Sequence, residues 1–395
     1  MYFVNGVRIE KERVRNVRFE RKKKKRMLTH VMKILYVANV RMPTEKAHGI
    51  QIAKTCEAFV KAGADVELVV PDRATHIKES VAEYYGLKNA FPVTRLRVPD
   101  IVSWGFVGFM IESLVFALAA AREARRRDSL VYGRDEIVLA AVTLFTNCPI
   151  VWESHTGAWN ILARYVSRRA KEMVVITGGL RDFYVDRGVP SEKIHVAHDG
   201  LDRADFEHAE SKEDARARLG LPRDMRIALY IGALGGWKGT DTLFEASEFL
   251  PDTVRIAVIG GTQDQIARAR KKFPRVLFLG EKPYRDIARN QAAADVLVLP
   301  NTGKDVISVH FTSPLKLFTY MASDRPIVAS DIPSTREVLP EGAAFWFVAD
   351  DAESLAEAIQ KAQSDPNASE KVSIAKSQVL LYTWDARARA ILAKI

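Results

Sequence analysis

The second half of the chain contains a glycine-rich loop and a glycine turn of the kind that can cradle a phosphate group. The loop runs from Gly232 to Gly239 (GALGGWKG) and carries one lysine, Lys238. It lacks the GxxxxGK[ST] order of a Walker A loop. The turn is Gly260-Gly261. Glycine lets a ligand come close to the backbone, and an ammonium group neutralises phosphate charge, so both elements are candidates for holding a phosphorylated ligand.

A third element of this kind begins at Ser313 and reads SPLKLFTYMA. Ser313 is a suitable helix N-cap, and Pro314 suits the first helical position because its missing N–H costs nothing there. The free N–H groups of a helix start over Leu315 and Lys316 attract phosphate, and the Lys316 ammonium adds a full charge. An ordinary capped amphipathic helix with a surface lysine is the alternative interpretation.

Polar and titratable residues in the first half follow predicted strands. Arg134 follows one strand, and Glu153 and His155 follow the next along the chain. Because ligands of doubly wound sheets bind at the carboxyl ends of strands, Arg134 and Glu153 are candidates for acceptor binding and His155 for chemistry. Gly49 opens a predicted helix after the first strand, where a missing side chain would let a ligand approach. The full GxGxxG fingerprint is absent, so Gly49 alone also fits plain packing.

The elements that must position these residues are short apolar runs, which predict buried parallel strands. In the first half the predicted strands are Lys33–Ala38, Asp65–Val70, Val93–Val98, Ser129–Tyr132, Pro149–Trp152, Glu172–Thr177 and Lys193–Ala197. In the second half they are Arg226–Ile231, Val254–Ile259, Val276–Leu279, Val296–Leu299, Pro326–Ala329 and Ala344–Val348.

Amphipathic helices alternate with these strands, which predicts right-handed βαβ units and an α/β fold. The polar, charged segment from Arg203 to Asp224 separates two such halves. We therefore expect two Rossmann-like, doubly wound domains whose ligand edges face each other across a cleft. The predicted divisions are residues 1–31, 32–205, 206–375 and 376–395.

The net charge of +10 is concentrated at the N-terminus. Residues 1–31 hold 11 Lys/Arg and 3 Glu, which leaves only about +2 for the rest of the chain. This basic extension is expected to be disordered or to lie upstream of the natural start, and a nucleic-acid partner is not expected from it alone. The only cysteines, Cys56 and Cys148, form no disulfide or zinc pattern, and this favours a cytoplasmic protein.

The segment from Ile101 to Ala121 is unusually apolar, with Glu112 as its only charged residue. We expect a buried helix or a helix at the lip of the cleft. A membrane span is an alternative, although Gly105 and Gly108 interrupt its first part. A third interpretation is that its exposed part touches an anionic membrane or a lipid-linked substrate, which would make the protein peripheral to the membrane.

No Asp-x-Asp pair and no clustered set of His, Cys and carboxylate residues is present in the sequence. We therefore expect no catalytic divalent metal ion and no cofactor.

Over most of residues 32–395 the chain resembles family 4 glycosyltransferases of the GT-B fold. The motifs that carry the resemblance in the first half are Met32-Lys-Ile-Leu-Tyr-Val, His48-Gly49-Ile50, Glu153-Ser-His155 and His198-Asp-Gly-Leu-Asp202. In the second half they are Tyr230-Ile-Gly232, Lys238-Gly239, Ser313-Pro-Leu-Lys-Leu-Phe-Thr-Tyr-Met-Ala322, Pro326-Ile-Val-Ala-Ser-Asp331 and Tyr382-Thr-Trp384 with Arg387.

The resemblance implies a retaining transferase that moves a sugar from a nucleotide diphosphate donor to a glycan or lipid-linked acceptor. His155 would stand near the donor sugar, and Gly49 and Gly232 near the donor. Lys238 would neutralise the leaving diphosphate, and the backbone from Ser313 to Lys316 would also hold it. The last helix of such a fold returns to the first domain.

Three positions depart from the family pattern. Ala233 stands in place of the usual arginine, and Phe311 and Thr319 stand in place of two glutamates. Thr319 can offer the donor ribose only one hydroxyl. These departures motivate a second hypothesis, a non-catalytic GT-B protein that binds a glycan, lipid or partner. A sugar-nucleotide epimerase is a third.

Overall fold

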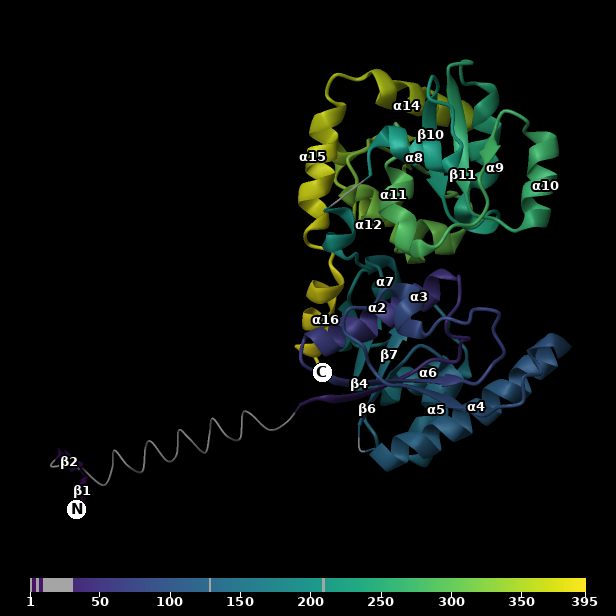
Figure 1. The fold of residues 1–395 in the computed structure, drawn as a ribbon. Coiled ribbons are helices and arrows are strands. Elements are labelled where there is room, and N and C mark those ends of the chain that lie inside the picture. The colour runs from purple at the N-terminus through teal and green to yellow at the C-terminus, as the bar shows by residue number, and fades with distance from the viewer. Residues whose placement is uncertain (1, 5–6, 10–30, 128, 208–209) are drawn as a thin grey trace.

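A computed structural model describes residues 2–4, 7–9, 31–127, 129–207 and 210–395 (Figure 1). Most of the basic extension expected over residues 1–31 lies outside the described residues. Within it, β1 (Tyr2–Val4) and β2 (Val7–Ile9) pair as antiparallel strands. The remaining described chain forms two lobes, the lower and the upper one in Figure 1, each built around a parallel sheet.

The first sheet has seven strands in the order β5-β4-β3-β6-β7-β8-β9, all parallel. This is a doubly wound order, in which the direction of winding reverses between β3 and β6. The strands are β3 (Lys33–Val37), β4 (Asp65–Pro71), β5 (Val93–Leu96), β6 (Leu130–Gly133), β7 (Ile150–Ser154), β8 (Glu172–Val175) and β9 (Ile194–Val196).

The second sheet has six strands in the order β12-β11-β10-β13-β14-β15, again all parallel. Its winding reverses between β10 and β13. The strands are β10 (Arg226–Ile231), β11 (Val254–Ile259), β12 (Leu277–Phe278), β13 (Val296–Leu299), β14 (Ile327–Ser330) and β15 (Phe345–Phe347). The two predicted doubly wound sheets are confirmed.

Helices cover both faces of each sheet, and this is why the strands are apolar on both sides. In β3, Leu35 packs into the core on one face and Tyr36 into the core on the other. The helices are α2 (Ala47–Lys61), α3 (Val81–Tyr85), α4 (Phe106–Arg127), α5 (Glu136–Phe145), α6 (Ile161–Arg169), α7 (Gly178–Val185), α8 (Lys212–Leu219), α9 (Thr240–Glu245), α10 (Gln263–Lys272), α11 (Ile287–Gln291), α12 (Leu315–Ala322), α13 (Pro333–Arg336), α14 (Ala352–Ser364), α15 (Ala368–Val379) and α16 (Trp384–Leu392).

The apolar segment expected as one helix over residues 101–121 is divided in the structure. A 3₁₀ turn, Val102–Trp104, ends at Gly105, which has a φ of +77°, and α4 follows from Phe106 to Arg127. One face of α4 packs on the first sheet and the other is exposed. Among the described residues, no helix has the length and apolarity that a membrane crossing requires.

The C-terminal chain returns to the first domain, as expected. Helix α15 packs on α12, and its Ala375 and Val379 belong to a second-domain core. Helix α16 packs on α2, and its Trp384 and Ile391 belong to a first-domain core. The chain therefore crosses after Val379, a few residues later than the division expected at residue 376. Figure 1 shows this path in yellow.

Candidate functional site

The glycine-rich loop after β10 lies at the point where the second sheet reverses its winding. Gly239 ends the loop with a φ of +65°, and a Cβ there would overlap the carbonyl of Pro300, which follows β13. Only glycine allows this contact between the loop and the chain after β13. The loop is thereby fixed over the crevice between β10 and β13, the expected place for a ligand.

Lys316, in the first turn of α12, lies beneath this loop. Its Nζ donates to Tyr230 Oη at 2.9 Å and lies 4.1 Å from the centre of the Tyr230 ring. A Cβ at Gly232 would come within 2.9 Å of that Nζ, so glycine at this position makes room for the ammonium group. Lys238 Nζ lies 3.0 Å from the centre of the Trp237 ring, at the end of the same loop.

The two lysines make the crevice electropositive. Burial, and then the charge of Lys238, hold the pKa of Lys316 well below its usual range. Burial lowers the pKa of Lys238 to about 8. Neither ammonium group has a carboxylate ion-pair partner in the described part of the chain. Two half-buried, neighbouring cations without a counter-charge are stabilised when an anion binds between them.

The side chains at the start of α12 do not act as the sequence predicted. Ser313 is not the N-cap: its Oγ accepts a hydrogen bond from the backbone N–H of Asp199, 3.2 Å away in the first domain. Pro314 takes the N-cap position, and no side chain caps the helix. The Leu315 side chain packs against a first-domain core. These side chains join the domains, and the uncapped amides remain as candidate phosphate ligands.

Thr319 has no free hydrogen-bonding group to offer a ligand. It is 1% exposed, donates to the carbonyl of Lys316 at 2.9 Å and accepts from Gln291 Nε2 at 2.8 Å. The hydroxyl therefore belongs to the packing beneath α12. The expected contact between Thr319 and the donor is contradicted by this burial.

In the first domain, a buried carboxylate organises the ligand edge. Glu153, at the end of β7, is fully buried. Its Oε1 lies 2.8 Å from Nη2 of Arg134 and 3.1 Å from Nη2 of Arg387, and Tyr132 donates to its Oε2. Burial alone would raise the pKa of Glu153, but the two guanidinium groups and the bond to His155 hold it well below its usual range.

Glu153 also orients the predicted catalytic histidine. His155 Nε2 lies 2.6 Å from Glu153 Oε1, and the imidazole is 17% exposed. Burial and the charge of Arg134 lower the pKa of His155 to about 4, so the ring is neutral near pH 7. The hydrogen-bond partners assign the proton to Nε2, which leaves Nδ1 as an acceptor.

The sequence assigned both Glu153 and Arg134 to the acceptor side, but the structure gives these two paired residues different roles. Glu153 is fully buried and both of its oxygens are engaged by neighbouring side chains, so its role is to hold His155 and the arginines. Arg134 is 18% exposed and also donates to Gln51 Oε1 at 3.2 Å, so it remains an acceptor candidate.

Gly49 has a packing reason to be glycine. It is the third residue of α2 rather than its start, and a Cβ there would collide with Tyr85 Oη and Thr44 Cγ2. The space that a Cβ would take is filled by protein. The expected approach of a donor phosphate to the backbone of Gly49 stays a prediction.

Arg387 is a site residue that sequence reasoning named only within a motif. It lies on α16, is 6% exposed, and donates to the carbonyl of Ala197 and to Thr55 Oγ1, both at 3.3 Å. The Tyr382–Arg387 motif was assigned to the returning helix, but 234 positions separate Arg387 from Glu153. Only the tertiary fold shows that it pairs with the carboxylate behind His155.

Phe311 joins the two domains at the place where the family pattern has a glutamate. It is 8% exposed, belongs to a first-domain core, and its ring centre lies 5.2 Å from that of Phe183. Next to it, Thr177 Oγ1 donates to the carbonyl of His310 at 2.8 Å. The domains are in direct contact here, and a carboxylate at position 311 would be buried among aromatic rings.

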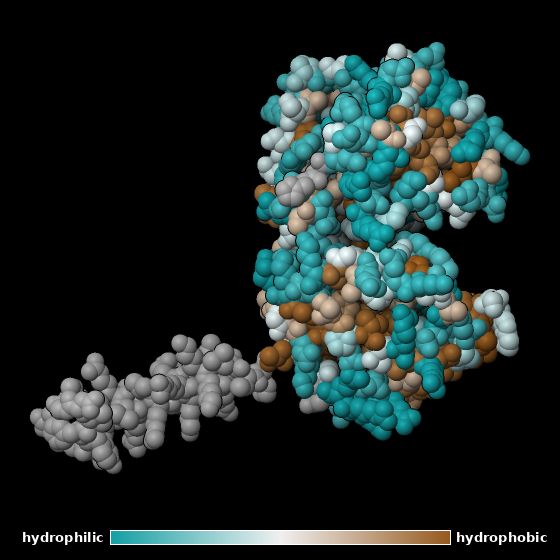
Figure 2. Space-filling view, in the orientation of Figure 1, coloured by the Kyte–Doolittle hydropathy of each residue, from teal (hydrophilic) through white to brown (hydrophobic). Residues whose placement is uncertain are grey.

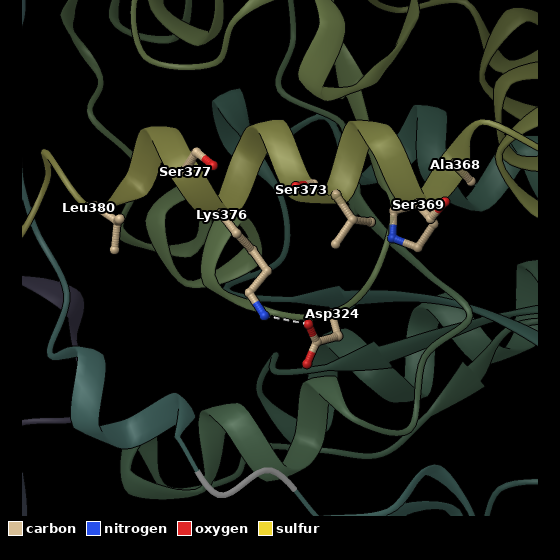
Figure 3. A pocket seen from close by; sticks show the side chains of 9 residues that line it. Asp324, Ala368, Ser369, Ser373, Lys376, Ser377 and Leu380 are labelled. Carbon is tan, nitrogen blue, oxygen red and sulfur yellow. Dashed lines mark hydrogen bonds and ion pairs between the residues drawn. The ribbon is translucent and has the colours of Figure 1, made fainter.

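A hollow of about 770 Å³ lies elsewhere, between α15 and the loop that leads into β14. Lys376 and Asp324 form an ion pair of 2.5 Å across it (Figure 3). This is the amino end of β14, opposite to the edge where the two lysines lie. The hollow is therefore separate from the candidate site.

Comparisons with known proteins agree with this architecture. A model described as Glycosyltransferase Family 4 matches residues 49–205, and one described as Glycosyl transferases group 1 matches residues 225–365. A protein of Bacillus subtilis named as a teichuronic acid biosynthesis glycosyltransferase, TuaC, is 23% identical over 84% of this chain and 89% of its own length. The alpha-maltose-1-phosphate synthase of Mycolicibacterium smegmatis is 27% identical over 62% of this chain and 68% of its own.

Solved structures share the fold. HepE of Anabaena, in complex with UDP and glucose, superposes with a TM-score of 0.74 at 16% identity and covers 92% of this chain and 98% of its own. Sucrose-phosphate synthase of Thermosynechococcus elongatus gives 0.73 at 19% identity, with 92% and 98% coverage.

The fold and the site together define a glycosyltransferase of the GT-B class. The two matched regions and the relatives support a family 4-type glycosyltransferase, and the predictions of this type and of an enzyme are confirmed. The non-catalytic alternative is not favoured.

Proposed function

We propose that the protein transfers a sugar from a nucleotide diphosphate sugar, held on the second domain, to a glycan or lipid-linked acceptor on the first. One observation carries the donor assignment: Lys238 and Lys316 are half-buried, neighbouring cations with no carboxylate partner among the described residues. The diphosphate of the donor supplies the missing negative charge. Because the lysines neutralise it, the proposal includes no metal ion and no cofactor.

In the proposed reaction the bond between the anomeric carbon and the diphosphate oxygen breaks, and its electron pair leaves with the diphosphate. Lys238 and Lys316 stabilise that developing charge. The acceptor oxygen bonds to the anomeric carbon on the face that the diphosphate leaves, which retains the configuration. The departing diphosphate oxygen takes the proton of the acceptor hydroxyl. His155, neutral and fixed by Glu153, accepts a hydrogen bond from a hydroxyl of the donor sugar through Nδ1.

A uridine donor is the first candidate. The support is that HepE, which shares the fold, has been solved with UDP and with UDP-glucose. The acceptor class follows from the resemblance and from the carbohydrate synthesis for which TuaC is named. We propose a cytoplasmic enzyme that works at a membrane surface, where a lipid-linked acceptor is available.

A thermal-shift screen of the full chain against sugar nucleotides and nucleoside diphosphates, without metal, tests the donor assignment. A ligand at one hundred times its Kd stabilises the folded state by about 2.7 kcal/mol, so a true donor raises the Tm measurably. Lys316→Met is the matched control and should show no shift. If no compound in the panel raises the Tm of the wild type, the donor assignment is wrong.

Donor binding should weaken as the pH rises above about 8. Bound diphosphate favours the charged form of Lys238, so its pKa must rise from about 8 on binding. The ligand therefore binds most tightly below the free pKa and loses affinity above it. Calorimetric titration with a sugar nucleotide between about pH 6.5 and 9.5 measures this, since the diphosphate of a sugar nucleotide does not itself titrate there. A Kd that is constant over the range would show that Lys238 does not contact the diphosphate.

A further inference from the structure

Helix α4 presents an exposed apolar face on the first domain. The most exposed large apolar residues of this region are Phe106 (77%) and, in the turn before the helix, Trp104 (72%). Val107, Met110, Ile111, Leu114, Val115 and Leu118 form the exposed face by helical spacing. Phe106 and Phe109 lie on the side that Phe116 and Ala117 bury further along, and are exposed because the first turns of the helix are uncovered. In Figure 2 hydrophobic residues reach the tip of the lower domain, where Figure 1 shows one end of α4. A contiguous apolar patch of this kind marks an interaction surface.

The exposed face does not belong to a loosely packed helix. Phe116, Ala117, Ala120 and Ala124 bury the opposite face in the first-domain core. Near the middle, Glu112 is fully buried and forms an ion pair with Arg73. The helix is therefore anchored on one side, and its apolar residues on the other side have no partner within the described chain. Such a helix needs a further apolar surface to cover it.

Basic residues continue this face at the C-terminal end of the helix. Arg122, Arg125 and Arg126 are exposed; Arg122 follows Leu118 by four positions, and Arg125 follows Leu118 by seven, so both lie on the face of Leu118. Arg126 has one weak contact, 3.7 Å from Glu123. An apolar stripe that ends in arginines matches the layers of an anionic bilayer, in which acyl chains lie beneath charged headgroups.

We propose that α4 docks the protein on an anionic lipid bilayer, with its apolar face in the acyl boundary and its arginines among the headgroups. This deepens the proposed function, because it identifies the source of a lipid-linked acceptor. Asn39 and Arg73, which follow β3 and β4 at the ligand edge of the first sheet, bind α4 through Ser113 and Glu112. Docking through α4 thus brings the acceptor edge of the cleft to the membrane.

Vesicle co-sedimentation of the full chain tests this surface. The variant is Phe106→Gln, Val107→Gln and Leu114→Gln, which keeps good helix formers in place. The matched control is Phe249→Gln, Val348→Gln and Leu381→Gln, three exposed apolar residues outside this face. The vesicles are equal parts phosphatidylglycerol and phosphatidylcholine, at low salt and at about 1 M salt, where charge attraction is screened within about 3 Å. This screening removes the attraction of the basic residues 1–31.

At high salt we expect wild type and control to remain bound, and the α4 variant to partition at least about tenfold less. Replacing Arg122, Arg125 and Arg126 with glutamine should weaken binding to anionic vesicles at low salt by up to about fivefold per arginine, and leave binding to neutral vesicles unchanged. Equal partitioning of the α4 variant and the wild type at high salt would overturn the proposal. So would a wild type that binds no vesicles but forms a dimer that the α4 variant loses, because the partner would then be a second copy.

The donor thermal shift of the α4 variant separates this proposal from the proposed function. If the α4 variant no longer binds vesicles but still shows the donor thermal shift, it has lost only membrane docking. If the wild type binds vesicles and the α4 variant does not, but the wild type shows no donor thermal shift, the proposed donor is contradicted and the membrane surface is kept.

Discussion

Replacing Lys316 with methionine is expected to lower kcat/KM by about 10²- to 10³-fold while leaving the protein at least as stable as the wild type. The loss follows because Lys316 is placed to stabilise the charge that develops on the diphosphate, and one such group is typically worth about 2.7–4 kcal/mol in the transition state. The stability follows because a half-buried ammonium without a counter-charge is unfavourable, whereas methionine fills a similar volume. Tyr230 loses one donor but still donates to the carbonyl of Ala233 at 2.8 Å.

The measurements are steady-state kinetics with the donor found by thermal shift, and urea unfolding of both proteins. Because burial lowers the pKa of Lys316, the unfolded wild type binds more protons than the folded one between the folded-state pKa of Lys316 and about pH 10.5. The free energy of unfolding of the wild type therefore rises with pH in this window. The extra stability of the Lys316→Met variant over the wild type should become smaller as the pH rises. Lys376→Met, at the hollow on the opposite edge, is the control and should keep full activity. A variant that keeps its activity, or loses activity only because it unfolds, would contradict the role of Lys316.

Replacing Glu153 with glutamine is expected to destabilise the protein by about 3–5 kcal/mol, the usual effect of breaking a buried ion-pair network. The change leaves Arg134 and Arg387 buried without their shared carboxylate. It also replaces the charged acceptor of the His155 Nε2–H with a neutral amide that carries one acceptor and one donor, which weakens the hold on the His155 tautomer, so the residual folded protein should lose activity as well.

Urea unfolding at neutral pH measures the loss, and Asp385→Asn is a matched control from the same returning helix. Asp385 pairs with Lys61 at the surface, so its replacement should change stability by less than about 1 kcal/mol. Because the pKa of Glu153 is held well below 4.5, its contribution is present above pH 4.5 and declines as the pH falls towards the folded-state pKa. The variant should therefore lose less stability than the wild type on acidification. A variant as stable as the wild type at neutral pH would show that the network is not a structural element.

The alternation of apolar runs and amphipathic helices was enough to predict both sheets and their ligand edges. Strands such as Arg226–Ile231 and Val254–Ile259 have the expected bounds, because a strand buried on both faces must be apolar throughout. Lys238 and Lys316 were also found from sequence. Lys238 lies within the glycine-rich loop, and Lys316 lies in the first turn of the helix after Ser313. Local sequence patterns therefore predict the position of both lysines.

The tertiary structure alone decided what the other site residues do. Whether Ser313 caps its own helix or binds Asp199 depends on a domain 114 residues away, and nothing local favours one partner over the other. Likewise Glu153 is buried, rather than open to an acceptor, because Arg387 returns on α16 to pair with it. Long-range pairs of this kind follow from how the two domains pack, and helix and strand periodicities carry no record of that packing.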